Sequence, residues 1–172
     1  MKKNNWIKVL IIWVLYVALH FTYKYIPCGL TQLFGCPEES IFHHMKMAFF
    51  AYSLVSIVEY FILKPQYRES FISSRMLSVL LISYFSFMVW LFVPVVIGPI
   101  HAPWFEIVYS NLILALSLSA VIYIETFTEK ITFNKTVTRI ISLIYLIILT
   151  VFVVSTFSPP EMDVFSPHEH TH

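Results

Sequence analysis

The sequence predicts an all-α, polytopic membrane protein, a bundle of five transmembrane helices. Of its 172 residues, 58% are hydrophobic and only 12% are charged, about half the ~25% charged residues of a soluble domain. The hydrophobic residues fall in five stretches, each close to the roughly 20 residues that a helix needs to cross a bilayer. This composition excludes a disordered chain and a nucleic-acid-binding module. The expected partners are therefore membrane lipids and not nucleic acid.

Each expected helix is bounded by residues that interrupt an apolar run. The first stretch ends before Pro27, and it is too long and too polar, with His20 and Lys24, for a cleaved signal peptide. The second follows Pro37 and two acids, which favour a helix N-terminus. Polar segments separate the others, and the chain after the fifth begins with Ser158 and two prolines, which cannot continue a helix. We expect helices over residues 6–25, 41–63, 76–96, 104–127 and 140–157, all in one domain covering residues 1–172, with 158–172 as a tail.

Lysine and arginine residues predict the orientation, because they are held on the cytoplasmic side of a membrane. With the N-terminus inside, nine of the eleven bases are cytoplasmic, and the exceptions are Lys24 and Lys46. Five spans then place the C-terminal tail outside the cell membrane. The formal net charge of +1 divides into +5 inside, from nine bases and four acids, and −4 outside, from two bases and six acids.

All seven histidines fall on the outer half in this topology. His20 lies roughly 10 Å inside the outer end of the first helix, His43 and His44 lie in the second turn of the second helix, and His101 precedes the fourth. The other three close the tail and are expected to be solvated: His168, His170 and His172. Histidines supply metal ligands and proton carriers near neutral pH, so a functional site is expected on the outer face.

Acidic and basic side chains join these histidines. A helical period places Glu39, His43 and Lys46 on one face of the second helix, and Ser40 and His44 on another. An ionisable residue at the centre of a span costs ~2.5–3.5 kcal/mol on the insertion scale, so such residues tend to face protein or water. We expect Lys46 to pair with a carboxylate for this reason. At the inner ends of the second and fourth helices, we expect Glu59 and Glu125 to pair with Arg68 or Lys130.

The leading functional hypothesis is a divalent-metal site of zinc or iron, since imidazole and carboxylate groups suit both metals. Such a site would open toward lipid-like substrates, with Glu39 and Lys46 as candidate catalytic residues and Lys46 stabilising negative charge. The candidate metal ligands are His20, Glu39 and His44, completed by His43, His101 or Glu106.

Three other functions fit the same residues. A proton-coupled or metal-ion carrier would need a polar path through Asn111 toward Glu59 and Glu125. A b-type haem protein would use His20 with His43 or His44 as axial ligands. In a non-catalytic membrane assembly protein, the polar cluster would only hold helices together. The sequence contains no Walker motif, no H-E-x-x-H and no G-x-S-x-G, which disfavours ATP-driven transport, zincin proteases and ordinary serine hydrolases.

Two cysteines lie in the first outer loop. Cys28 and Cys36 flank a short segment that contains two glycines, and an extracytoplasmic location permits disulfide formation. We expect a Cys28–Cys36 disulfide, with a pair of free thiols as the alternative.

The segment from Glu39 to Lys46, E-S-I-F-H-H-M-K, resembles a motif of an uncharacterised family of small five-helix prokaryotic membrane proteins. That family shows E-S-x-x-x-H-x-K at the start of its second helix. The sequence H-F-T-Y from His20 and the Ser158-Pro159-Pro160 segment are also similar to the family. The resemblance implies a prokaryotic membrane protein but supplies no reaction, and at position 43 the family has an acid where this chain has histidine. It implies these site residues: His20, Glu39, Ser40, His44 and Lys46.

Overall fold

The computed structural model describes residues 5–98 and 103–160, and within them the chain is all-helical. Five helices are long and apolar enough to cross a membrane, in agreement with the five expected spans. A sixth, α2 (Gly29–Phe34), is a short helix between the first two long ones. The long helices are α1 (Asn5–Tyr25), α3 (Ile41–Leu63), α4 (Arg68–Ile97), α5 (Pro103–Thr128) and α6 (Lys135–Phe157).

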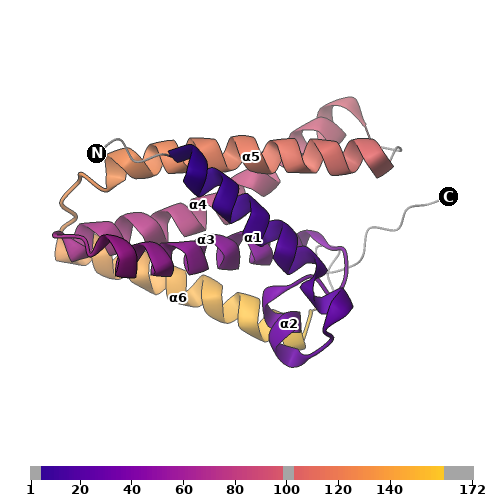
Figure 1. Cartoon of the computed structure of the whole chain (residues 1–172), viewed down its shortest axis with the longest axis horizontal. Coiled ribbons are helices and arrows are strands. Elements are labelled where there is room, and N and C mark those ends of the chain that lie inside the picture. Colours follow the sequence, from indigo (N-terminus) through magenta and orange to yellow (C-terminus); the bar gives the residue numbers. More distant parts are fainter. Residues whose placement is uncertain (1–4, 99–102, 161–172) are drawn as a thin grey trace.

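The long helices run back and forth along one axis of the molecule (Figure 1). At one end, which we call the histidine end, α1 and α6 finish, α3 begins and α2 lies across the bundle. At the opposite end, which we call the arginine end, α1 begins and α3 and α5 finish. Helix α1 therefore starts at one end of the bundle and α6 finishes at the other, as an odd number of spans requires.

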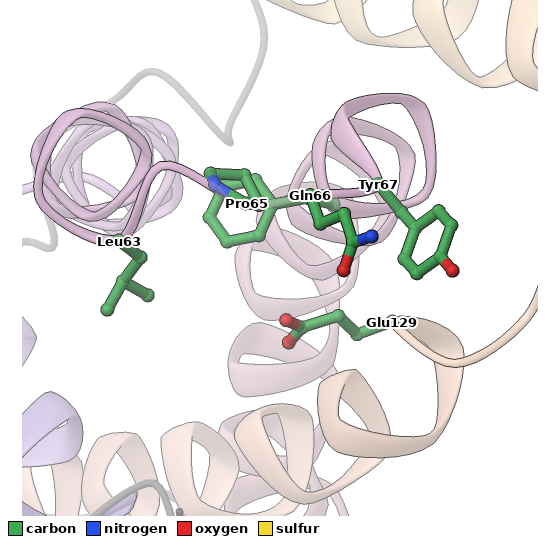
Figure 2. Close-up of a pocket in the computed structure, with 6 residues that line it drawn as sticks. Leu63, Pro65, Gln66, Tyr67 and Glu129 are labelled. Atoms are coloured by element: carbon green, nitrogen blue, oxygen red, sulfur yellow. The ribbon is translucent and has the colours of Figure 1, made fainter.

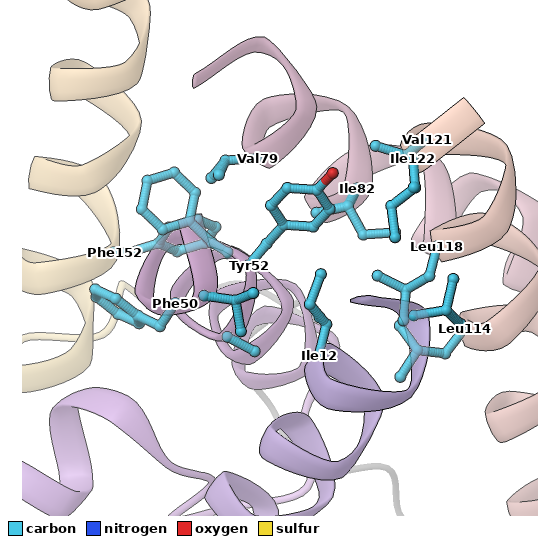
Figure 3. Close-up of a cluster of buried hydrophobic side chains, with 14 of the residues drawn as sticks. Ile12, Phe50, Tyr52, Val79, Ile82, Leu114, Leu118, Val121, Ile122 and Phe152 are labelled. Carbon is cyan, nitrogen blue, oxygen red and sulfur yellow. The ribbon is translucent and has the colours of Figure 1, made fainter. Parts of the chain in front are cut away.

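Helix α3 is the centre of the bundle. Half of its most apolar 18-residue window is buried, compared with 11% for α6. Figure 3 shows why: Phe50 and Tyr52 of α3 meet Ile12 from α1 and Phe152 from α6, and side chains of α4 and α5 complete the ring around them. A helix that is apolar on all sides must be covered by lipid or by neighbouring helices, and α3 is the long helix with the largest buried share. Polar groups on α3 are consequently held in fixed positions by the surrounding helices.

Local hydrogen bonds define where helices begin and end. The hydroxyl of Ser40 accepts from the backbone N–H of His43 and caps the start of α3, which satisfies a donor that would otherwise be unpaired. At the other end of α3, Lys64 adopts a left-handed conformation with φ of 44°, and Pro65 follows it. Asn134 caps α6 in the same way as Ser40 caps α3, accepting from Val137 at 2.9 Å.

Two expectations about the elements were wrong. Helix α4 begins at Arg68, eight residues before the expected start at residue 76, and residues 29–34 are helical where a loop was expected. The early part of α4 is polar in sequence, but Ser73, Ser74 and Arg75 are buried. Ser74 lies 2.7 Å from the Thr128 hydroxyl, oxygen to oxygen. In sequence, a helical segment whose polar side chains are bonded inside a bundle looks the same as a polar loop.

Candidate functional site

His20 and Glu39 meet at the histidine end of the bundle. His20 lies on α1, five residues before the helix ends, and Glu39 directly precedes the residue that caps α3. Nε2 of His20 is 3.7 Å from Oε1 of Glu39, which is longer than a hydrogen bond. The side chain of His20 is 23% exposed and that of Glu39 is 72% exposed. The bundle therefore holds the imidazole, while the carboxylate approaches it from the surface.

His44 is a fixed neighbour of this pair. Its ring stacks on that of His20, with centroids 5.6 Å apart and an angle of 13° between the planes. Its Nδ1 lies 2.8 Å from the hydroxyl oxygen of Tyr16, one turn before His20 on α1. A hydrogen bond to one ring nitrogen fixes the orientation of an imidazole. Three residues that α1 and α3 contribute thus form a stack of Tyr16, His44 and His20.

A cavity of about 440 Å³ opens beside the His20–Glu39 pair. This volume is within the range of small-molecule sites, ~300–1,000 Å³. Besides His20 and Glu39, the wall contains the cation Lys24 and the thiol of Cys36. The other lining residues are Phe21, Tyr23, Pro27 and Pro37. The cavity therefore combines one basic, one acidic and one imidazole group with apolar walls.

The structure places His43 and Lys46 in other surroundings than the cavity. Nδ1 of His43 lies 2.7 Å from the Ser40 hydroxyl, and His43 is buried. Lys46 is fully buried; its Nζ donates to the backbone oxygen of Gln32 at 2.8 Å and to the hydroxyl of Thr156 at 3.2 Å. Lys46 thus ties α2 and α6 to α3. The expected carboxylate partner of Lys46 is not found among the described residues.

The expected metal ligands are not brought together. In residues 5–98 and 103–160, no three His, Cys, Asp or Glu side chains are placed to hold one metal ion. His43 is turned to Ser40, and Glu106 lies in the first turn of α5, which Figure 1 shows away from α2 and the end of α1. His101 and the three tail histidines lie outside the described residues. Of the six expected ligands, His20, Glu39 and His44 are neighbours.

Cys28 and Cys36 are free thiols in the structure, not the expected disulfide. The Sγ of Cys28 lies 3.5 Å from the hydroxyl of Thr31, and the Sγ of Cys36 donates to the backbone oxygen of Glu38 at 3.0 Å. The hydrogen bond from Thr31 lowers the pKa of the Cys28 thiol. Burial raises the pKa of Cys36 to about 12. Two thiols eight residues apart thus differ sharply in chemical environment.

We expect Cys28 to react with iodoacetamide at pH 8 at least roughly tenfold faster than Cys36, because the thiolate is the reactive form. This pH is far below the pKa of Cys36, which is about 12, so the Cys36 thiol is almost fully protonated. The Cys28→Ser and Cys36→Ser variants isolate each thiol, and intact mass measures the rates. Equal rates, or a wild-type protein that is quantitatively unreactive until it is reduced, would contradict the free-thiol arrangement.

At the arginine end, four charged side chains from four helices form a closed ring. Nζ of Lys8 is 2.6 Å from Oε2 of Glu59 and 2.7 Å from Oε1 of Glu125. On the other side of the ring, Nε of Arg75 is 2.9 Å from Oε2 of Glu59, and Nη1 of Arg75 is 3.0 Å from Oε1 of Glu125. The hydroxyl of Tyr52 donates to the second oxygen of Glu125 at 2.7 Å. Two bases and two acids make the ring neutral. Because each base contacts both acids, the ring joins α1, α3, α4 and α5.

A second cavity, of about 260 Å³, lies beside this ring. Figure 2 shows the carboxylate of Glu129 in its wall, together with Gln66 and Tyr67 from the connection between α3 and α4. Oε2 of Glu129 is 3.3 Å from Nη1 of Arg75. A second nitrogen of Arg75, Nη2, is buried and has no hydrogen-bond partner among the described residues. Glu129 therefore connects the neutral ring to solvent at this end.

The partners of Glu59 and Glu125 differ from those expected. Lys8 and Arg75 bind them instead of Arg68 and Lys130. The sequence contained a signal for this ring, because Lys8 lies inside the first apolar stretch, and a charge within a span must find a partner. The sequence predicts a loop before residue 76, whereas the structure places Arg75 inside α4, where it faces the other helices of the bundle.

An apolar layer separates the two polar regions. On α3, residues 47–51 are all apolar and buried, and they lie between Lys46 and Tyr52. The carrier hypothesis needs a polar path through Asn111. The side-chain oxygen of Asn111 accepts a hydrogen bond from the indole of Trp13 at 3.0 Å. Along α3, this buried apolar segment therefore interrupts the polar side chains between the two ends.

Comparisons with known proteins identify no relative. No family model, no curated protein and no solved structure matches this chain at a significant level.

Proposed function

We propose that the cavity at the histidine end is the working site, and that it binds the headgroup of a membrane lipid or a similar amphiphile. In this proposal, His20 and Glu39 form a proton-transfer pair. One observation carries it: α1 and the segment just before α3 bring His20 and Glu39 to 3.7 Å on the wall of a 440 Å³ cavity. Imidazole and carboxylate groups are common general acids and bases, which suits this pair to acid–base chemistry on a bound ligand.

The depth of the cavity supports a lipid ligand. Its wall is built from the last turns of α1, ending at Tyr25, and from residues that precede the start of α3 at Ile41. In a chain whose five long helices cross a bilayer, this is the depth of the lipid headgroups. A ligand whose charged end enters here keeps its apolar part in the hydrocarbon layer.

An exposed apolar stripe on α1 leads to the cavity. Leu10, Val14 and Phe21 are exposed, and spacings of four and seven residues place them on one face of the helix. Phe21 also lines the cavity. An acyl chain lying along this stripe would bring its headgroup to His20 and Glu39.

The positive-inside rule supports an extracytoplasmic location for this site. Among the described residues, the arginine end has seven bases and four acids, an excess of +3, and the neutral ring leaves this excess unchanged because it takes up two of each. The histidine end keeps its excess of acids. We infer that the cavity faces the outer leaflet.

Cys36 provides a built-in reporter of occupancy, because its thiol lies in the cavity wall. We expect a short-chain phospholipid to slow methanethiosulfonate labelling of Cys36 in delipidated Cys28→Ser protein. In Glu39→Gln or His20→Gln, protection should need about tenfold more phospholipid, because each variant loses one interaction with a charged group. Glu38→Gln is the matched control, since Glu38 is exposed and outside the cavity wall. Labelling that phospholipid does not slow would overturn the proposal.

A divalent metal at the same pair is a second candidate, favoured by the length of the His20–Glu39 contact. Two ligands of a tetrahedral zinc at ~2.1 Å lie roughly 3.4 Å apart, close to the 3.7 Å between Nε2 and Oε1. His44, whose ring stacks on that of His20, would have to move to become a third ligand. We expect this candidate to give stoichiometric zinc or iron in protein purified without chelators, and less metal in His44→Ala. Trace metal in the wild-type protein would remove it.

A further inference from the structure

We propose that the ligand of the histidine-end cavity is an aminophospholipid, whose headgroup carries both a phosphate and a primary amine. This inference rests on the proposed function, because it names the ligand class for the same site. It follows from the charges that the cavity brings together and from where they lie.

The two formal charges of the cavity wall have opposite sign. Lys24 lies one turn after His20 on α1, so both point from the same face of that helix, while Glu39 reaches the cavity from the start of α3. The cation of Lys24 suits a phosphate, and the carboxylate of Glu39, which lies beside His20, suits an ammonium group. The cavity is therefore charge-complementary to a zwitterion.

Other common headgroups match less well. An anionic headgroup without an amine would bring phosphate charge close to the carboxylate of Glu39 and offer that carboxylate no ammonium group. A quaternary ammonium group satisfies the charge of Glu39 but cannot donate a hydrogen bond to it. A primary amine supplies both charge and donor, which makes the stronger, charge-assisted hydrogen bond.

The second cavity does not offer this pattern. Among its lining residues, which are all described, Glu129 is the one charged group, and it already contacts Arg75. The apolar stripe of Leu10, Val14 and Phe21 leads to the histidine-end cavity, where it gives the acyl chains a surface. Charge complementarity therefore distinguishes the histidine-end cavity from the second one.

The test is native mass spectrometry of the full chain released from nanodiscs that contain equal amounts of phosphatidylethanolamine, phosphatidylcholine and phosphatidylglycerol. We expect the retained lipid to be phosphatidylethanolamine, with an enrichment of about tenfold, as for one hydrogen bond to a charged group. Glu39→Gln should abolish the preference while a phospholipid is still retained, and Lys24→Gln should reduce retention of all three. Glu38→Gln and Lys64→Gln are matched controls, because both residues are exposed and outside this cavity wall.

The outcomes separate this inference from the proposed function. Retention of one phospholipid with no headgroup preference would overturn the inference and leave the proposed function standing. Wild-type protein that retains no lipid, and whose Cys36 is not protected by phospholipid, would overturn both. A preference that persists in Glu39→Gln would show that the amine is recognised elsewhere, and would also overturn the inference.

Discussion

Replacing Glu125 by glutamine is expected to lower the free energy of unfolding by about 3–5 kcal/mol, the cost of removing one partner from a buried ion pair. The carboxylate contacts Lys8, Arg75 and the hydroxyl of Tyr52, so its loss leaves an unbalanced charge in the bundle. For a chain of this size, the shift in midpoint temperature is on the order of 10 °C. Thermal unfolding in detergent, followed by tryptophan fluorescence, measures it.

The matched controls are Arg68→Gln and Lys130→Gln, the alternative partners that chain proximity suggests. Both bases lie outside the ring, and each change should alter stability by less than about 0.5 kcal/mol. The double variant Lys8→Met with Glu125→Gln removes one charge of each sign and should recover part of the loss. An unchanged midpoint for Glu125→Gln, or an equal loss in Lys130→Gln, would contradict the ring.

Gly35→Ala is expected to displace the segment between α1 and α3. A Cβ atom at Gly35 would lie 2.6 Å from the backbone oxygen of Thr31 and 2.9 Å from that of Leu19 on α1. Both contacts are with backbone, so the segment must move, at a cost of about 1–3 kcal/mol. Cys36 is the next residue, and its thiol should become more reactive as burial is lost.

Gly29→Ala is the matched control, because a Cβ there meets nothing within 4 Å. The rate of Cys36 alkylation in a Cys28→Ser background reports the displacement. We expect a clear increase for Gly35→Ala and none for Gly29→Ala. If the two variants react at the same rate, residues 26–40 are not packed on α1 as described.

The five long helices could be predicted from the sequence because their signal is local: an apolar run of sufficient length bounded by residues that stop a helix. The start of α4 could not. Its first turns carry Ser73, Ser74 and Arg75, whose partners lie on other helices. A local pattern cannot distinguish a polar segment that faces water from one that faces the interior of a bundle.

The candidate site was predictable only in part, because a sequence pattern reports local features and does not show which residues meet across helices. The sequence singles out His20 and Glu39 as ionisable residues near the ends of spans, and the structure brings them within 3.7 Å of each other. Helical periodicity grouped Glu39 with His43 and Lys46, but those two are bound by Ser40 and by Gln32 and Thr156. The unexpected helix α2 supplies the oxygen of Gln32, so the environment of Lys46 depended on an element that the sequence did not reveal.

The central claim is that the working site lies at the histidine end, and headgroup photo-cross-linking tests it most directly. A phosphatidylethanolamine with a photoreactive group in its headgroup, incorporated into nanodiscs, is expected to label residues 20–24 and 36–39, which flank the cavity. Excess unlabelled lipid and the Glu39→Gln variant should both reduce this labelling, whereas Glu38→Gln should not. Labelling spread equally over both ends of the bundle, unaffected by Glu39→Gln, would contradict the claim.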